Sequence, residues 1–207
     1  MSGFFSLDNA FFRIVTKVCH VLFLSLIWLV CSIPIVTIGA STSAINTVML
    51  RMVRDEESYL VRSFFKAFKA NFKQSTIIWL LIIVGFIIIG VDLFFFARMG
   101  NWLGIICAGL FFAVIFVMGL TLMLVFHYQV WFENPVKVTL INSFRTALGY
   151  LPYSAALLIL FVAMGYAIYV SVPLMIFFIF FGMGIFSYIS AYLWRKIFDK
   201  LEHPSIK

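Results

Sequence analysis

Residues 76–97 read TIIWLLIIVGFIIIGVDLFFFA, and this stretch decides the class of the fold. Its apolar side chains cover every face of a helix, and a helix needs roughly 20 apolar residues to cross a bilayer. The strands of a membrane β-barrel alternate apolar and polar residues, so an unbroken apolar run excludes that architecture. The sequence therefore predicts a transmembrane helix at this position.

The composition of the whole chain extends this prediction. Of the 207 residues, 64% are hydrophobic and only 11% are charged, with a mean hydropathy of +1.12. Soluble domains carry roughly 25% charged residues. No Asp, Glu, Lys or Arg occurs in 18–50, 99–132 or 146–194. We therefore expect an all-α polytopic transmembrane helical bundle, built as a single integral membrane domain over residues 1–207.

The number of spans depends on the segment that follows Pro34. A proline and a glycine interrupt the apolar pattern at 34–39, and a further helix over 41–54 would be only about 20 Å long. That helix is either a short or tilted crossing or a continuation of the first span beyond a kink. The sequence thus predicts five to six spans, at about 11–33, 41–54 (the short one), 76–97, 102–126, 154–170 and 173–194.

The distribution of basic residues predicts the orientation. Six spans place every Lys and Arg except Arg98 in the cytoplasm, whereas five spans with an external N-terminus also move Arg13 and Lys17 outside. Both arrangements follow the positive-inside rule, and the six-span one follows it better. The net charge of +7 then reflects this bias and does not indicate a nucleic-acid partner. The predicted cytoplasmic parts are the basic segments 55–75 and 133–152 and the tail 195–207.

Residues 61–73, VRSFFKAFKANFK, predict a short amphipathic cytoplasmic helix. Apolar side chains lie on one face, and the basic side chains form a stripe about 110° round the axis. Such a helix seats at the membrane interface, docks on a cytoplasmic protein or binds polyanionic lipid. The candidate docking residues are Arg62, Phe64, Phe65, Lys66, Phe68, Lys69, Phe72 and Lys73.

Two further candidate sites lie within the apolar segments. The segment 34–39 is either an unwound break that exposes backbone groups to a solute or an ordinary turn between two helices. Asp92 is the candidate intramembrane acid, with an interfacial ion pair to Arg98 as the alternative. The candidate residues of the helix break or polar cleft are Pro34, Thr37, Gly39, Thr42 and Asn46.

Signatures of enzymes and cofactors are missing from the sequence. His20 and His127 have no second ligand at metal spacing, and no HExxH pattern or Walker-type glycine loop occurs. Three cysteines fall in apolar segments without CxxC spacing, as small buried hydrophobic residues do. We therefore expect no enzymatic activity, no cofactor and no metal site.

Three motifs resemble a known family. Residues 31–40 read CSIPIVTIGA, residues 63–75 read SFFKAFKANFKQS and residues 143–152 read SFRTALGYLP. In this order they resemble the YesL family of small bacterial membrane proteins. Members are often encoded beside sugar ABC importers and glycoside hydrolases. The resemblance implies a multi-pass protein of the bacterial cell membrane with a cytoplasmic C-terminus.

The resemblance also implies a function. It suggests an accessory or scaffold component of a carbohydrate ABC uptake system, with membrane lipids and ABC permease subunits as partners. It names no catalytic residues. The alternative is an independent small-solute transporter or channel, which requires a polar pathway through the bundle.

Overall fold

The computed structural model describes residues 10–56 and 59–202. The end of the predicted tail, 203–207, and residues 57–58 within the predicted basic segment 55–75 lie outside the described residues. The described residues form helices joined by short turns. In chain order these are α1 (Ala10–Cys31), the 3-10 helix η1 (Ile35–Thr37), α2 (Ile38–Val53), α3 (Leu60–Ala97), α4 (Trp102–Trp131), α5 (Val136–Gly149), α6 (Leu151–Val170), α7 (Val172–Phe177), the π-helical η2 (Phe178–Gly182) and α8 (Met183–Glu202).

Five helical segments are long and apolar enough to cross a membrane. The last of them passes without interruption through α7, η2 and α8. The prediction of an all-α polytopic bundle is thereby confirmed. The five segments are Phe12–Cys31, Leu60–Ala97, Trp102–Trp131, Leu151–Val170 and Val172–Glu202.

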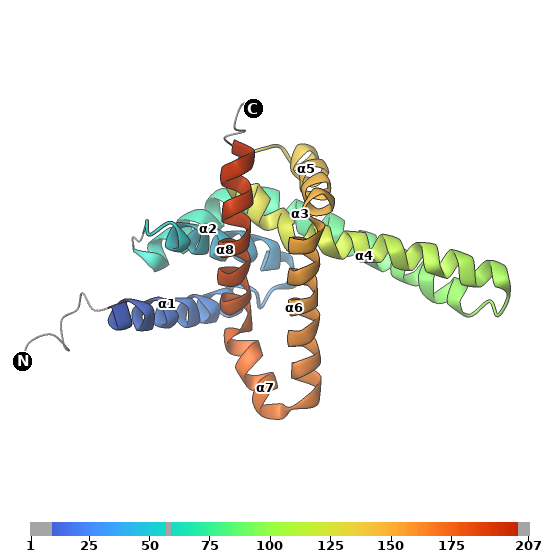
Figure 1. Ribbon diagram of the computed structural model, residues 1–207, viewed down its shortest axis with the longest axis horizontal. Coiled ribbons are helices and arrows are strands. Elements are labelled where there is room, and N and C mark those ends of the chain that lie inside the picture. The colour runs from blue at the N-terminus through green and yellow to red at the C-terminus, as the bar shows by residue number, and fades with distance from the viewer. Residues whose placement is uncertain (1–9, 57–58, 203–207) are drawn as a thin grey trace, which may run out of the picture.

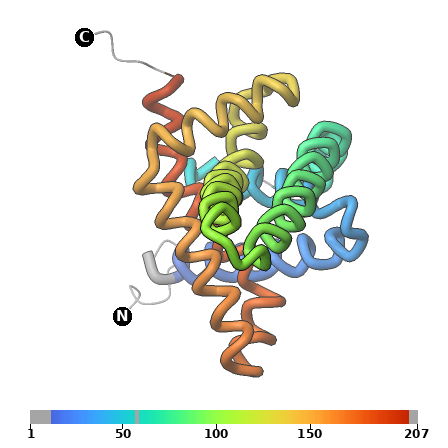
Figure 2. Tube along the Cα trace, turned by 90° about the vertical axis from the view of Figure 1, so that its right-hand side faces the viewer, coloured from blue at the N-terminus to red at the C-terminus, as the bar shows by residue number. Residues whose placement is uncertain are grey.

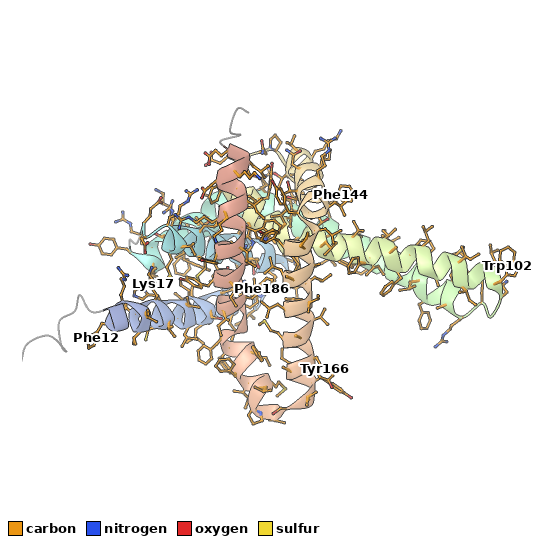
Figure 3. The ribbon with its side chains drawn as sticks, viewed as in Figure 1. Phe12, Lys17, Trp102, Phe144, Tyr166 and Phe186 are labelled. Carbon is orange, nitrogen blue, oxygen red and sulfur yellow. The ribbon has the colours of Figure 1, made fainter. Side chains whose placement is uncertain are left out.

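Two long helical hairpins project from a common centre. The hairpin of α3 and α4 runs crosswise to the hairpin of α6 with α7 and α8 (Figures 1 and 2). Large aromatic side chains stand out near the tips, where Trp102 is 74% exposed and Tyr166 is 68% exposed (Figure 3). Exposed Trp and Tyr are typical of the boundary between a membrane and water.

The helix ends that lie opposite the tips of the hairpins meet in a region rich in charged side chains. We call this region the charged end. Lys17 of α1 lies 2.5 Å from Asp55, which follows α2, and its hydrogen bond and positive charge lower the pKa of Asp55. Arg195 of α8 donates a hydrogen bond to the carbonyl oxygen of Val53, the last residue of α2. These contacts hold the start of α1, the end of α2 and the last turns of α8 together.

Helix α2 runs through the middle of the bundle. It leads from the far end of α1 back to the charged end, so α1 and α3 both start there. It contacts α1, α3, α4 and α8, and every residue from 39 to 46 is buried. With 16 residues it is about 24 Å long, shorter than the five long segments. Thus α2 is surrounded by protein over most of its length, and it is not among the five segments long enough to cross a membrane.

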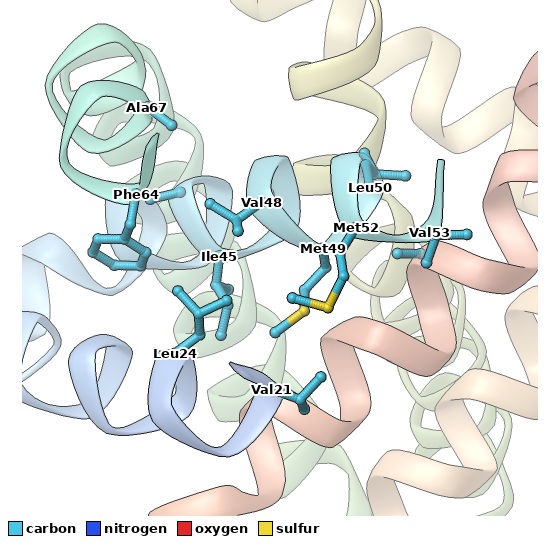
Figure 4. Close-up of a cluster of buried hydrophobic side chains, with 12 residues drawn as sticks. Val21, Leu24, Ile45, Val48, Met49, Leu50, Met52, Val53, Phe64 and Ala67 are labelled. Atoms are coloured by element: carbon cyan, nitrogen blue, oxygen red, sulfur yellow. The ribbon is translucent and has the colours of Figure 1, made fainter. Parts of the chain in front are cut away.

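An apolar cluster joins α2 to α1 and α3. Leu24, Ile45, Met49 and Phe64 have no exposed surface, and they pack together from three helices (Figure 4). Ala67 lies one turn beyond Phe64 on the same side of α3, over Val48 in the same cluster. This cluster fixes the first turns of α3 against the bundle.

The predicted amphipathic helix is not a separate element. Residues 61–73 and the span 76–97 form one 38-residue helix, α3. The expectation of a short independent helix is therefore wrong, because no Gly or Pro occurs from 60 to 84 to interrupt the helix. Ser75 at the junction is wholly buried and hydrogen-bonded within the bundle.

Gly39 permits the close approach of α2 to α3. A Cβ atom at this position would lie 2.5 Å from the carbonyl oxygen of Ser75 and 2.6 Å from Cβ of Trp79. Both contacts involve rigid parts of α3, so a side chain at residue 39 would push the two helices apart.

We expect Gly39→Ala to lower the free energy of unfolding by about 1–3 kcal/mol, the usual cost of overpacking. Gly90→Ala is the matched control, since a Cβ atom there has no neighbour within 4 Å. Unfolding of the purified protein in detergent measures both changes. Equal effects of the two substitutions would contradict the close approach of α2 to α3.

Candidate functional site

Buried polar side chains meet at the centre of the bundle, on α2, α3, α4 and α8. All of them are at most 3% exposed. They are uncharged amide, hydroxyl and imidazole groups in an otherwise apolar interior, where an unpaired polar group is costly. We call this set the polar centre, and it consists of Ser43, Asn46, Ser75, His127, Gln129, Ser187 and Ser190.

One half of the polar centre joins α2, α3 and α4. The hydroxyl oxygens of Ser43 and Ser75 lie 2.7 Å apart, so the two side chains share a hydrogen bond. The amide Nε2 of Gln129 donates to the Ser75 hydroxyl at 2.8 Å, and its Oε1 lies 3.2 Å from that hydroxyl. These contacts connect the Gln129 amide of α4 to α3.

The other half joins α2, α4 and α8 around His127. Nδ2 of Asn46 lies 3.3 Å from His127 Nδ1, and Ser190 Oγ lies 2.9 Å from His127 Nε2. An amide nitrogen can only donate, so Nδ1 accepts and Nε2 carries the proton. This tautomer is consistent with the hydroxyl of Ser187, which donates to Oδ1 of Asn46. One imidazole thereby bridges α2 and α8.

Two cavities reach the polar centre. A polar cavity of about 480 Å³ opens between α2, α3 and α4, and Gln129 forms part of its wall. A second cavity of about 190 Å³ lies among α1, α2, α3, α4, α6 and α8, with Thr42, Asn46 and His127 in its mostly apolar lining. Different residues of the polar centre therefore line the two cavities.

The segment 34–39 forms a compact turn. The hydroxyl of Thr37 lies 2.7 Å from the carbonyl oxygens of both Cys31 and Pro34, and η1 leads directly into α2. Pro34 is exposed and Gly39 is the contact point with α3. The structure supports the turn and not the unwound break.

Only two of the candidate cleft residues reach the polar centre or its cavities. Thr42 accepts a hydrogen bond from Trp28 Nε1 at 3.2 Å and lines the 190 Å³ cavity, and Asn46 belongs to the polar centre itself.

Asp92 lies apart from the polar centre. Within residues 10–56 and 59–202, no ion pair joins it to Arg98. Residues six apart in a helix lie about 240° apart around its axis, so the two side chains face different ways. Arg98 instead lies over the ring of Phe94, four residues earlier, at 4.2 Å from its centroid. The predicted interfacial ion pair is therefore wrong.

The phenyl rings of the candidate docking segment divide between the interior and the surface. Phe64 is wholly buried and Phe68 packs against the core, so neither belongs to a free docking surface. Phe65 and Phe72 are 46% and 39% exposed. Beside these two rings lie the exposed basic residues, and together they form the basic aromatic face: Arg62, Phe65, Lys66, Lys69, Phe72 and Lys73.

The part of the chain that the structure describes contains no cluster of three or more His, Cys, Asp or Glu side chains that could hold a metal ion. The polar centre contains no carboxylate, and His127 is its single titratable side chain. The polar centre can hold the helices in register, and its side chains can form hydrogen bonds with polar groups of a solute.

Several residues of the polar centre escaped the sequence analysis. Ser187 and Ser190 lie three residues apart in an apolar helix, as Ser43 and Asn46 do. Polar residues at this spacing share one helix face, and in a charge-free segment this spacing indicates an inward-facing polar stripe. Ser75 and Gln129 offer no such local signal, because each lies beside other polar residues, Gln74 and Thr76 or His127, and the sequence does not show which of them points inward.

We expect Asn46→Ala to lower the free energy of unfolding by about 1–3 kcal/mol, because it leaves buried polar partners on α4 and α8 unpaired. The control is Thr121→Ala, since the Thr121 hydroxyl bonds only to the Val117 carbonyl of its own helix at 3.0 Å. Denaturant titration in detergent compares the two variants. Equal stability of the two variants would contradict a structural role for this hydrogen-bond network.

Comparison with known proteins gives one match. A family model described as "Protein of unknown function, DUF624" matches residues 21–93, which contain the second half of α1, all of α2 and most of α3. No curated protein and no solved structure matches the chain. The chain is thus similar to this family over the part that carries the basic aromatic face and three of the seven residues of the polar centre.

Proposed function

We propose that this protein is an accessory or scaffold component of a carbohydrate ABC uptake system in the bacterial cell membrane. The basic aromatic face carries the proposal, because it presents exposed rings and cations on a helix that continues into a membrane hairpin. The carbohydrate system is inferred from the resemblance to the YesL family. The match to the DUF624 model over residues 21–93 agrees with that resemblance.

The mechanism depends on the continuity of α3. Phe64 and Ala67 anchor the first turns of α3 in the core, while Phe65 and Phe72 stay exposed on the other side. A partner that docks on these turns is therefore connected rigidly to the α3–α4 hairpin. The protein holds a cytoplasmic partner in a fixed position relative to membrane neighbours of that hairpin.

The charged end is assigned to the cytoplasm. Residues 98–101 and 171, at the tips of the two hairpins, contain a single charged residue, Arg98. Lys17, Arg54 and Arg195 all make their ion pairs or hydrogen bonds at the opposite end. The positive-inside rule supports a cytoplasmic position for the C-terminal turns of α8 and the basic aromatic face.

Co-purification in mild detergent tests this proposal. We expect the wild-type protein to retain permease subunits of a sugar ABC importer, and the double variant Lys69→Glu/Lys73→Glu to lose them by charge repulsion. The matched control is Arg98→Glu, which reverses a charge at the far tip and should retain the permease. A wild-type protein that repeatedly fails to retrieve any ABC permease would contradict the scaffold function.

A small-solute transporter or channel is the second candidate function. One specific observation favours it, namely that hydrogen-bonding residues of the polar centre line two cavities. Purified protein in liposomes should then move a solute without other subunits, and Asn46→Leu should slow that movement. Asp92→Asn should leave the rate unchanged, because Asp92 lies outside the polar centre. Liposomes that stay inert towards sugars and other small polar solutes would contradict transport.

A further inference from the structure

The polar cavity at the charged end has the properties of a ligand site. Its volume of about 480 Å³ falls in the range of small-molecule sites, roughly 300–1,000 Å³. Three helices contribute polar side chains to it. The groups that matter for a ligand are Arg51 from α2, Lys66, Asn71 and Gln74 from α3, and Gln129 and Glu133 from α4.

The net charge of the side chains that line the cavity is positive. Arg51 and Lys66 supply two cations, and Glu133 supplies one carboxylate. Among the residues that the structure describes, neither cation forms an ion pair, although Lys17, Arg54 and Arg195 all do so nearby. Two cations on facing helices repel each other, so a bound anion would stabilise this arrangement.

The inner wall of the cavity offers an oriented donor. Gln129 is 2% exposed, and its Nε2 donates one hydrogen to the Ser75 hydroxyl at 2.8 Å. The second N–H of this amide has no partner within the described part of the chain. Asn71 and Gln74 also use one amide hydrogen each, towards the carbonyl oxygens of Ala67 and Asn134 at 3.1 and 2.6 Å. Each of the three amides thus keeps a second hydrogen for a ligand.

We infer that this cavity binds a phosphate group of a small ligand, between Arg51 and Lys66 with the Gln129 amide at its inner end. A guanidinium pairs with two phosphate oxygens at once and an ammonium adds a point charge, while neutral amides complete the hydrogen bonds. The phosphate belongs either to a soluble phosphate ester or to the headgroup of an anionic lipid. Lys66 belongs both to this cavity and to the basic aromatic face, whereas Arg51 lines the cavity alone, so Arg51→Gln separates this binding from the scaffold function.

Two arms of one experiment separate these sources. In the soluble arm, protein in phosphatidylcholine nanodiscs is titrated calorimetrically with glycerol 3-phosphate and with inorganic phosphate. In the lipid arm, native mass spectrometry counts phosphatidylglycerol molecules that stay bound to protein released from mixed nanodiscs. Binding in either arm that depends on the cavity residues supports the site and identifies its source.

Single substitutions test whether binding depends on the residues of the cavity. We expect Arg51→Gln and Lys66→Gln each to weaken binding about tenfold or more, the loss of a charge-assisted hydrogen bond. The control variants Lys69→Gln and Lys73→Gln lie on the same helix outside the cavity and should change binding less than about twofold. Glu133→Gln should strengthen binding several-fold, because it removes a negative charge from the mouth without affecting a buried group.

Two results would overturn the inference. The first is the absence of binding in both arms for the wild-type protein, when its cooperative thermal unfolding shows that it is folded. The second is an equal loss of binding in the cavity and control variants, which indicates attraction to the general positive charge only. Neither result bears on co-purification with a permease, so the site and the scaffold function fail separately.

Discussion

The hydrogen bonds of α2 constrain the rest of the structure. This helix carries Ser43 and Asn46 into an interior that excludes water, where each unpaired polar group costs about 1–3 kcal/mol. Helices α4 and α8 therefore have to turn His127, Gln129 and Ser187 towards α2. Apolar surfaces of membrane helices slide over one another at little cost, so these directional bonds set the rotation of each helix about its axis.

The two hairpins follow from this centre. Helices α3 and α4 meet α2 through Ser75 and Gln129, and α8 meets it through Ser187. Beyond these contacts the side chains of the hairpins are apolar and exposed, as lipid-facing residues are. The structure thus combines a polar junction within the protein with apolar helices outside it. Close backbone approaches at Gly39 and at Gly184, whose N–H donates to Ser25 at 3.0 Å, bring the helices near enough for these bonds.

The class of the fold was accessible from the sequence because it depends on local properties. Apolar runs of sufficient length predicted the membrane helices, and the all-α class followed from them. The continuity of α3 was also visible in principle, since residues 60–84 contain no helix breaker. The division of its phenyl rings was not, because Phe64 and Phe65 are equally apolar and only tertiary packing decides which of them is buried.

The candidate site was only partly accessible. Asn46 and Thr42 were identified as polar residues near a proline, but the partners of Asn46 lie 81 and 141 residues further along the chain. No periodicity in one helix shows such a pairing. Asp92 drew attention because an acidic residue in a span is rare, yet its place on α3 keeps it away from the polar centre.

A double-mutant cycle between α2 and α8 tests the central claim most directly. The free energy of unfolding is measured in detergent for Asn46→Ala, Ser187→Ala and the double variant. If the two side chains bond to each other, the effects of the single substitutions overlap, and their sum should differ from the double variant by more than about 0.5 kcal/mol. Effects that add within about 0.3 kcal/mol would show that the two residues act independently and would contradict a hydrogen-bonded polar centre.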